Sequence, residues 1–356
     1  MKARLGDVCT VVSGSTPKST VPEYWDGDIK WITPAELSND TYIINDSARH
    51  ITALGVAKTG LKSFPAGTVI LSSRAPIGKT AIAGCEMFCN QGFKNLICSE
   101  KIDSKYLYYF LSGKTDYLNS LGRGATFKEI SKAIVENIEI PLPEVEEQKR
   151  IAARFERLLR LIQLQKAELE ELDKLVKSRF IELFGDPVLN QHGWRKVALE
   201  VNATLLNGRA YKQDELLDSG KYPVLRVGNF FSNRGWYYSD LELDDDKYCD
   251  NGDLLYAWSA SFGPQIWNGG KVIYHYHIWK VLVGEAYNKQ FLCKLLEYAT
   301  ESLMGDTHGI AMMHLTKSGM EKTEFIVPPI ERQEQFAAFV EQTDKSKLAV
   351  QKGLQE

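Results

Sequence analysis

The sequence lacks any apolar stretch near the roughly 20 residues that a membrane-spanning helix requires. Its amino terminus also lacks the charged-then-apolar layout of a signal peptide. We therefore expect a cytoplasmic protein that has no contact with a membrane. Cysteine is scarce: six cysteines are spread over 356 residues and none forms a C-x-x-C pair. This scarcity argues against a disulfide framework and against a ribbon-type zinc site.

A strong basic excess is absent as well, since the formal net charge is -3. Residues 1–143 hold 16 Lys and Arg against 14 Asp and Glu, whereas residues 184–328 hold 14 against 18. Much of the acidic excess lies in the run 241–253, which we expect to be a solvated loop turned away from any phosphate. Nucleic-acid binders usually carry a basic face. A nucleic-acid role would therefore need phosphate contacts from a partner.

Motifs of catalysis are also missing. The chain has no G-x-S-x-G elbow, no H-E-x-x-H segment, no complete phosphate loop and no N-P-P-Y or D-P-P-Y segment of the amino-methyltransferase type. These absences favour a recognition or assembly role over an enzymatic one.

What the sequence does contain is a long internal repeat. PEVEEQKRIAARF at 143–155 returns in altered form as PPIERQEQFAAFV at 328–340. Gly67 and Gly252 differ by 185 positions, as do Gln148 and Gln333. A period this long indicates a duplicated domain with a helical arm rather than a solenoid unit. With 44% hydrophobic residues, each copy can bury a core of its own.

Each copy is predicted to mix strands and helices. Short apolar runs at 68–73, 81–84 and 94–98 are bounded by Gly, Pro and Ser, which is typical of strands. The segment 103–113 starts with Asp, repeats apolar residues every three or four positions and stops at Gly, which predicts a short helix. Alternation in 272–281 predicts one half-buried strand with its aromatic residues on one face.

A long helix is predicted after each globular copy. Residues 144–183 would extend about 60 Å at 1.5 Å per residue, and their apolar residues alternate spacings of four and three, which is typical of a coiled coil. The alternative is an ordinary amphipathic helix packed on its own domain. Gln165 and Arg179 fall on the seam and could either set its register or be solvated. The expected seam residues are Ile151, Phe155, Leu158, Ile162, Leu169, Leu172 and Val176 in the first helix, and Phe336, Val340, Val350 and Leu354 in the second.

Several motifs together resemble the specificity subunit of type I restriction-modification enzymes, over essentially the whole chain. They are LGDVCTVVSG at 5–14, WITPAEL at 31–37, SSRAPIGK at 72–79, NQGFKNL at 90–96, GATFKEIS at 124–131 and IPLPEVEEQKRI at 140–151. The resemblance implies an α+β fold with two similar target-recognition domains, each followed by a long helix, and the helices packed as an antiparallel coiled coil. The expected bounds are 1–143 and 184–328 for the domains, 144–183 for the first spacer helix and 329–356 for the second, shorter one.

The resemblance also implies a function. Each domain of such a subunit reads one half of a bipartite double-stranded DNA target, and the helices fix the separation of the halves. Two methyltransferase subunits dock against it, and restriction or translocase subunits join them. The chain itself is then expected to be non-catalytic and to hold no cofactor, because S-adenosylmethionine, ATP and magnesium belong to the partner subunits.

Two other functions are weighed beside this one. Ser73–Thr80 ends in the G-K-T of a phosphate loop, which would suit a nucleotide-binding enzyme, but Ser73 replaces the first glycine and a strand is expected to follow. A coiled-coil scaffold without DNA binding is the third possibility. ATP-dependent binding that is lost on Lys79→Ala would favour the second function, and assembly without DNA affinity would favour the third.

Polar loop residues are the candidates for DNA contact, because Arg and Lys suit guanine or phosphate, and Asn and Gln suit adenine. Each could equally be a surface group that only structures its loop. His275 and His277 have no nearby cysteine or acid run to complete a zinc site, so no metal is expected. The first domain offers Thr16, Lys18, Arg74, Lys79, Asn90, Gln91, Arg123, Thr126 and Lys128, and the second offers Arg209, Tyr211, Lys212, Ser259, Ser261, His275, His277, His308 and His314.

Overall fold

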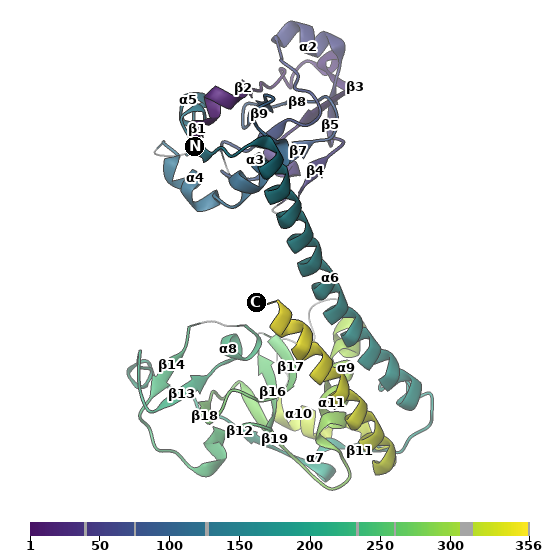
Figure 1. The fold of residues 1–356 in the computed structure, drawn as a ribbon. Coiled ribbons are helices and arrows are strands. Elements are labelled where there is room, and N and C mark those ends of the chain that lie inside the picture. The colour runs from purple at the N-terminus through teal and green to yellow at the C-terminus, as the bar shows by residue number, and fades with distance from the viewer. Residues whose placement is uncertain are drawn as a thin grey trace. The chain divides into compact units, whose positions relative to one another are not determined.

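A computed structural model describes residues 1–38, 41–74, 76–124, 128–232, 235–259, 261–306 and 316–354 (Figure 1). The chain divides into two compact units, Met1–Gln163 and Leu164–Glu356. We call them unit 1 and unit 2.

Unit 1 is built around a five-stranded sheet. Its strand order is β2 (Cys9–Ser13), β9 (Lys94–Cys98), β6 (Val69–Leu71), β7 (Thr80–Ala83) and β4 (Ile43–Ile44), with only the β7–β4 pair parallel. Helix α3 (Ser104–Ser112) lies against β6 and β7, and the Asp103 side chain caps it by accepting from the Tyr106 N–H at 2.9 Å. The expected helix at 103–113 is therefore present.

A smaller sheet in unit 1 has the order β5 (Arg49–Ile51), β3 (Trp25–Ile32) and β8 (Phe88–Cys89). A separate ribbon joins β1 (Lys2–Arg4) to β10 (Glu139–Pro141). Short helices fill the connections: α1 (Leu5–Val8), η1 (Pro22–Tyr24), η2 (Pro34–Glu36), α2 (Ala53–Thr59), α4 (Thr115–Leu121) and α5 (Lys132–Glu136).

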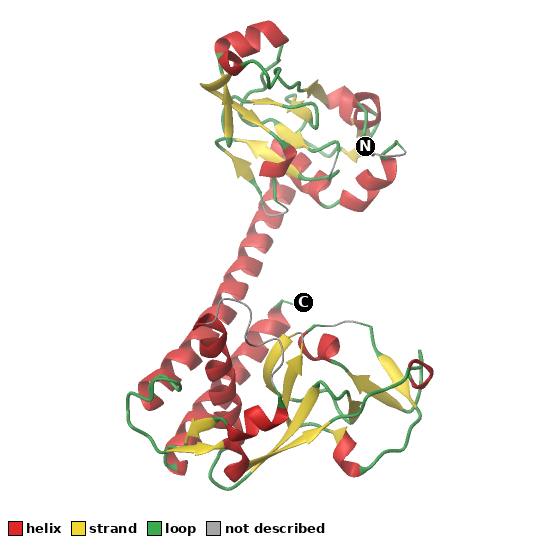
Figure 2. Cartoon of the chain, turned by 180° about the vertical axis from the view of Figure 1, so that it is seen from behind, coloured by secondary structure: helices red, strands yellow, loops and turns green. Residues whose placement is uncertain are grey.

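Unit 2 repeats this plan, and Figure 2 shows its strands and helices by type. One sheet has the order β12 (Ala203–Asn207), β19 (Ile278–Val283), β16 (Leu254–Ser259) and β17 (Ser261–Ile266). The other has the order β14 (Tyr237–Ser239), β13 (Tyr222–Leu225), β18 (Val272–Tyr274) and β15 (Tyr248–Cys249), and β11 (Lys196–Ala198) pairs with β20 (Glu324–Ile326). The remaining helices are α7 (Leu199–Asn202), η3 (Gln213–Glu215), α8 (Val227–Phe231), η4 (Asp245–Lys247), α9 (Lys289–Asp306), α10 (Lys317–Lys322) and α11 (Ile330–Gly353).

Strand registers confirm the internal repeat. Val69 pairs with Leu96 in unit 1, and Leu254 pairs with Val281 in unit 2, each residue 185 positions later. In the ribbon, Pro141 of β10 corresponds to Ile326 of β20 at the same offset of 185. Its partner Lys2 corresponds to Lys196, an offset of 194, which residues near the amino terminus follow. The predicted α+β fold of two similar domains, each followed by a long helix, is confirmed.

One sequence prediction fails in unit 2. Residues 272–281 do not form a single strand, because β18 ends at Tyr274 and β19 begins at Ile278. The backbone turns between them, and the Ile278 N–H donates to the His275 carbonyl at 2.9 Å. The alternation of aromatic and polar residues therefore reflects two buried strand ends joined by a turn.

The first long helix, α6 (Val145–Phe184), is 40 residues long and unbroken (Figure 1). Its last part packs against α11: the rings of Phe180 and Phe336 lie 5.4 Å apart, and Asp173 pairs with Lys347 at 2.5 Å. Near the end of α11, a Cβ added at Gly353 would lie 2.6 Å from the side chain of Gln165. Because the contacting residue numbers fall along α6 as they rise along α11, the two helices are antiparallel here.

The expected seam is buried along only part of α6. Val176, Phe336 and Val340 are buried, whereas Phe155 and Leu158 are 47% and 52% exposed. The stripe that enters the core of unit 2 is Val176, Phe180 and Phe184, with spacings of four. Arg179 is instead half-buried and pairs with Glu182 at 2.7 Å.

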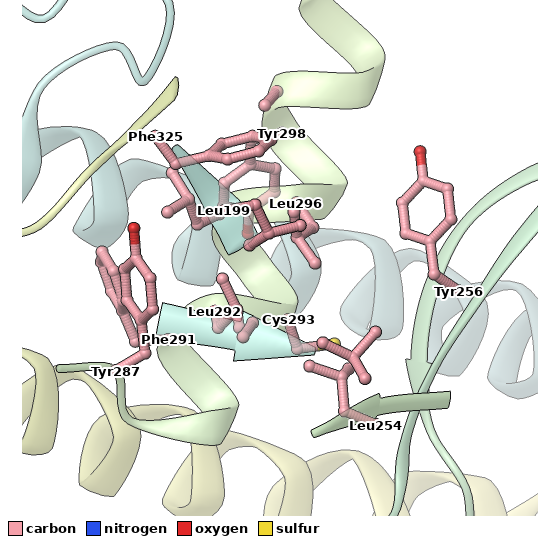
Figure 3. Close-up of a cluster of buried hydrophobic side chains, with 14 of the residues drawn as sticks. Leu199, Leu254, Tyr256, Tyr287, Phe291, Leu292, Cys293, Leu296, Tyr298 and Phe325 are labelled. Carbon is pink, nitrogen blue, oxygen red and sulfur yellow. The ribbon is translucent and has the colours of Figure 1, made fainter. Parts of the chain in front are cut away.

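Figure 3 shows the core that receives this stripe. Phe291, Leu292 and Leu296 of α9 are drawn there with Leu199 of α7 and Phe325 of β20. The rings of Phe180 and Phe184 join this core at 5.6 and 4.7 Å from Phe291. The end of α6 is therefore an integral part of unit 2.

A buried glutamine fixes the start of each long helix. The Gln148 amide accepts from the Asp103 N–H at 2.9 Å and donates to the carbonyls of Lys101 and Pro143 at 3.0 and 2.8 Å. Both Gln148 and Gln333 are 0% exposed.

Gln333 makes the same three bonds in unit 2, with the Asn288 N–H at 2.9 Å and the carbonyls of Ala286 and Pro328 at 3.0 and 2.8 Å. Each hydrogen-bonding partner of Gln333 lies 185 positions after the corresponding partner of Gln148. We call these two arrangements the glutamine clamps.

Replacing Gln333 with Leu leaves one N–H and two carbonyls buried without their partner, and each such group costs about 1–3 kcal/mol. We expect the free energy of unfolding of unit 2 to fall by at least about 2 kcal/mol, measured by urea titration of tryptophan fluorescence. Gln335→Leu, at an exposed position two residues along, is the control and should change it by less than about 0.5 kcal/mol. Equal effects of the two substitutions would contradict the clamp.

Candidate nucleic-acid interface

Two loops meet at one edge of unit 1. Gly14 after β2 passes so close to the loop after β8 that an added Cβ would lie 2.0 Å from the Cys89 carbonyl oxygen. The Ser15 N–H donates to that same carbonyl at 3.0 Å, and the Thr16 hydroxyl donates to the Gln91 side-chain oxygen at 2.5 Å. This contact brings together the predicted residues Thr16, Asn90 and Gln91. Gln91 is exposed, as is the predicted Lys18 two residues after Thr16.

The equivalent loops meet in unit 2. A Cβ at Gly208 would lie 2.4 Å from the Tyr274 carbonyl oxygen, and backbone bonds of 3.0 Å join Arg209 to Tyr274 and Tyr276. This contact brings together the predicted residues Arg209, Tyr211, His275 and His277, and the predicted Lys212 follows Tyr211 in the chain. The Arg209 guanidinium is already paired within the unit, because it makes two hydrogen bonds to the Glu215 carboxylate at 2.7 and 3.0 Å.

A third loop joins this surface of unit 2. Ser259 and Ser261 face each other across the β16–β17 hairpin. Trp258, next to them, donates its backbone N–H to the His277 carbonyl at 3.0 Å and its indole N–H to the Tyr276 carbonyl at 2.9 Å. The hairpin is therefore fixed to the turn that carries the two histidines.

His275 is held neutral by its surroundings. Burial, with the nearby His277 and Arg226, lowers its pKa to about 4. Its Nδ1 accepts from the His277 backbone N–H at 3.4 Å, so the neutral ring carries its proton on Nε2. Burial lowers the pKa of His277 as well. The turn thus presents neutral hydrogen-bonding groups rather than a positive charge.

A cluster of charged side chains lies in a different part of unit 1. Lys94, which sequence reasoning missed, is buried and lies 3.2 Å from Glu129, and Arg74 lies 3.7 Å from the same carboxylate. The backbone of Arg123 pairs with Glu129 through two bonds of 3.0 Å. The strand position of Lys94, between Phe93 and Asn95, gave no sign of this role. Lys94 and Arg74 thus share one carboxylate, the backbone of Arg123 is paired with the residue that carries it, and the predicted Lys128 next to that residue is exposed.

Lys79 is not free for a ligand, because its amine donates to the Leu37 carbonyl at 2.5 Å. Strand β7 begins at Thr80, directly after it. A phosphate loop needs a helix at this position, because the helix N-terminus provides the anion site. The described residues between β6 and β7, which pair as antiparallel strands, therefore do not form a phosphate loop.

Three predicted residues, Thr126, His308 and His314, lie outside the described part of the chain. Among the residues that are described, no group of three or more His, Cys, Asp or Glu side chains could hold a metal ion. Within the same ranges, no helix combines the length and the hydropathy needed to cross a membrane.

Comparisons with known proteins agree with the repeat. The sequence model of the family described as type I restriction modification DNA specificity domain matches residues 1–174 and 192–356. The type I restriction enzyme MjaIX specificity subunit of Methanocaldococcus jannaschii is 30% identical over 361 aligned residues, which cover 92% of this chain and 82% of that protein.

Two solved structures share the fold. The type I restriction-modification system S subunit from M. genitalium matches with a TM-score of 0.60 and 15% identity, covering 100% of this chain and 92% of that one. A chain from a structure on the complex assembly and conformational transition of the type I restriction-modification system matches with a TM-score of 0.63 and 18% identity, covering 99% and 92%.

The depressed pKa of His275 predicts a pH dependence of stability. Between a pH of about 4, the pKa of His275 in the folded chain, and about 6.5, the ordinary pKa of histidine, the unfolded chain binds a proton that the folded chain does not. Stability from this group is therefore complete above pH 6.5 and is lost as the pH falls. On going from pH 7 to pH 5, the urea midpoint of unit 2 should fall less in His275→Gln than in the unchanged chain. His192→Gln, at an exposed histidine, should retain the full pH effect; a retained effect in His275→Gln would contradict the assignment.

Proposed function

The chain belongs to the family of type I restriction modification DNA specificity domains, and from this membership we propose that it is the non-catalytic subunit that reads a bipartite double-stranded DNA target. Unit 1 and unit 2 would each read one half of the target. The methyltransferase and restriction subunits would carry the chemistry.

The duplication of the loop surfaces is the observation that carries this proposal. Gly14 and Gly208 make the same close approach in the two units, and each brings polar loop residues to one edge of a sheet. The side chains differ: Thr16, Asn90 and Gln91 stand in unit 1, and aromatic residues and histidines stand in unit 2. Similar scaffolds with different polar residues suit two half-sites of different sequence.

The long helix supports the bipartite part of the proposal. α6 starts at the clamp of Gln148 in unit 1 and ends in the core of unit 2 at Phe184 without a break. A helix of 40 residues is about 60 Å long. We infer that its length sets the number of unread base pairs between the half-sites.

Charge supports the need for partner subunits. Unit 2 carries a local acidic excess, and Arg209 and Arg74 each lie near a carboxylate of their own unit. Phosphate contacts position a protein on DNA, whereas base contacts give specificity. We therefore assign base recognition to this chain and most phosphate contacts to two methyltransferase subunits, which also bind S-adenosylmethionine. Restriction subunits would bring ATP and magnesium.

The other two functions lack support. In the segment Ser73–Thr80, Lys79 donates to a backbone carbonyl and a strand rather than a helix begins at Thr80, which does not support a nucleotide site. A scaffold without DNA binding does not account for the loop surfaces that both units repeat.

Methylome sequencing of a host that carries this chain with its methyltransferase subunit tests the proposal. We expect one methylated motif with two short specified halves separated by unread base pairs. Exchanging residues 192–328 for those of a relative should change one half and leave the other intact. Methylation without a bipartite motif, or motif changes in both halves, would contradict the proposal.

A further inference from the structure

A concave pocket of about 580 Å³ opens beside the histidine turn of unit 2. It lies between α8 and the segment after β18, and Arg226, Asn229, Trp236, Tyr237, His275 and His277 line it. None of its described lining residues is acidic. The pocket therefore combines hydrogen-bond donors with aromatic walls, next to the loop surface of this unit.

Arg226 differs from Arg209 and Arg74, the arginines of the loops that lie near a carboxylate. It follows β13 directly, its side chain is exposed, and its guanidinium lies 5.2 Å from the centre of the Tyr237 ring. Among the described residues, no carboxylate forms an ion pair with it, whereas Arg209 is paired with Glu215 and Arg74 lies near Glu129. An arginine that stacks on an aromatic ring keeps its in-plane N–H groups available for two parallel hydrogen bonds.

The neighbours of Arg226 are also fixed in place. The Asn229 amide donates to the Gly235 carbonyl at 3.2 Å, which ties α8 to the segment that carries Trp236 and Tyr237. His275 is oriented through its Nδ1 and offers an Nε2–H donor. A rigid set of donors selects a partner with acceptors at fixed positions.

We propose that Arg226 reads a guanine through its O6 and N7 atoms in the major groove of the half-site that unit 2 binds. This inference rests on the proposed DNA-reading function. Guanine presents two adjacent acceptors on that edge, and a bidentate arginine is the commonest specific contact to it. The absence of carboxylates from the described pocket lining disfavours cytosine, whose major-groove edge is a donor.

Unit 1 has no such reader at the equivalent place. Ile32 pairs with Cys89 in unit 1 as Leu225 pairs with Tyr274 in unit 2, so Thr33 corresponds to Arg226. Both the N–H and the hydroxyl of Thr33 donate to the Glu36 carboxylate, at 2.7 and 3.1 Å. The guanine contact would therefore belong to one half-site only.

The test uses the complex of this chain with its methyltransferase subunits and compares Arg226→Lys and Arg226→Ala with the unchanged chain. Lysine keeps the charge but loses the bidentate geometry. By methylome sequencing, we expect one G·C pair in one half-site to become degenerate in both variants, with the preference at that position falling about 5- to 150-fold. The other half-site and the spacer should stay as they are. Arg332→Ala removes an exposed arginine that also lies over a ring, 5.6 Å from the centre of Trp194 but on α11, and should leave the motif unchanged.

Modified DNA gives a second measurement that does not depend on folding of a variant. Replacing the assigned guanine with 7-deazaguanine removes N7 and should weaken binding by the unchanged complex but not by the Arg226→Ala complex. A motif that keeps every position in both variants would overturn the proposal. Uniform loss of affinity with an intact motif would also overturn it, because that is the signature of a phosphate contact. A complex that has no bipartite motif before any substitution would instead refute the proposed function.

Discussion

Two buried glutamines provide the constraint on which the arrangement depends, because each one fixes a long helix to the globular unit before it. Buried N–H and carbonyl groups are costly when unpaired, and Gln148 and Gln333 satisfy three such groups each at the first turn of α6 and α11. The start of each helix is thereby tied to the loop before α3 or α9. At its far end, α6 enters the core of unit 2 through Phe180 and Phe184. The helix is therefore anchored at both of its ends.

Under the proposed function, the residues that contact DNA lie outside this framework. The loops that carry Thr16 and Gln91 in unit 1 contact each other through backbone hydrogen bonds, as do the loops that carry Tyr211 and His275 in unit 2. Because these contacts use the backbone, the side chains can differ between the units while the scaffold stays the same. Charge is largely balanced locally, as in the pair of Arg209 with Glu215. Under the proposed function, such a surface contributes sequence discrimination, and affinity for the DNA backbone comes from the partner subunits.

Repetition and periodicity in the sequence were enough to predict the duplication, the mixed α and β character and the two long helices. They could not determine the phase of the buried stripe, because a strict 3.5-residue repeat drifts from the 3.6-residue period of a straight helix. The stripe therefore runs through Phe180 rather than Arg179. Long-range partners were also beyond sequence reasoning: Lys79 is bound by a carbonyl 42 residues away. Arg226 lies in none of the sequence motifs. Its correspondence to Thr33 of unit 1 follows only from the strand registers.

Under the proposed function, the length of α6 sets the separation of the two half-sites. Deleting Leu158–Leu164 removes one heptad from the part of α6 that precedes its contacts with α11, and keeps both ends of the helix nearly in phase. It shortens the helix by about 10 Å, which corresponds to about three base pairs at 3.4 Å each. Methylome sequencing should then show both half-sites unchanged with a spacer shorter by about three base pairs, and duplication of the same heptad should lengthen it. Unchanged spacers in both variants would contradict the account.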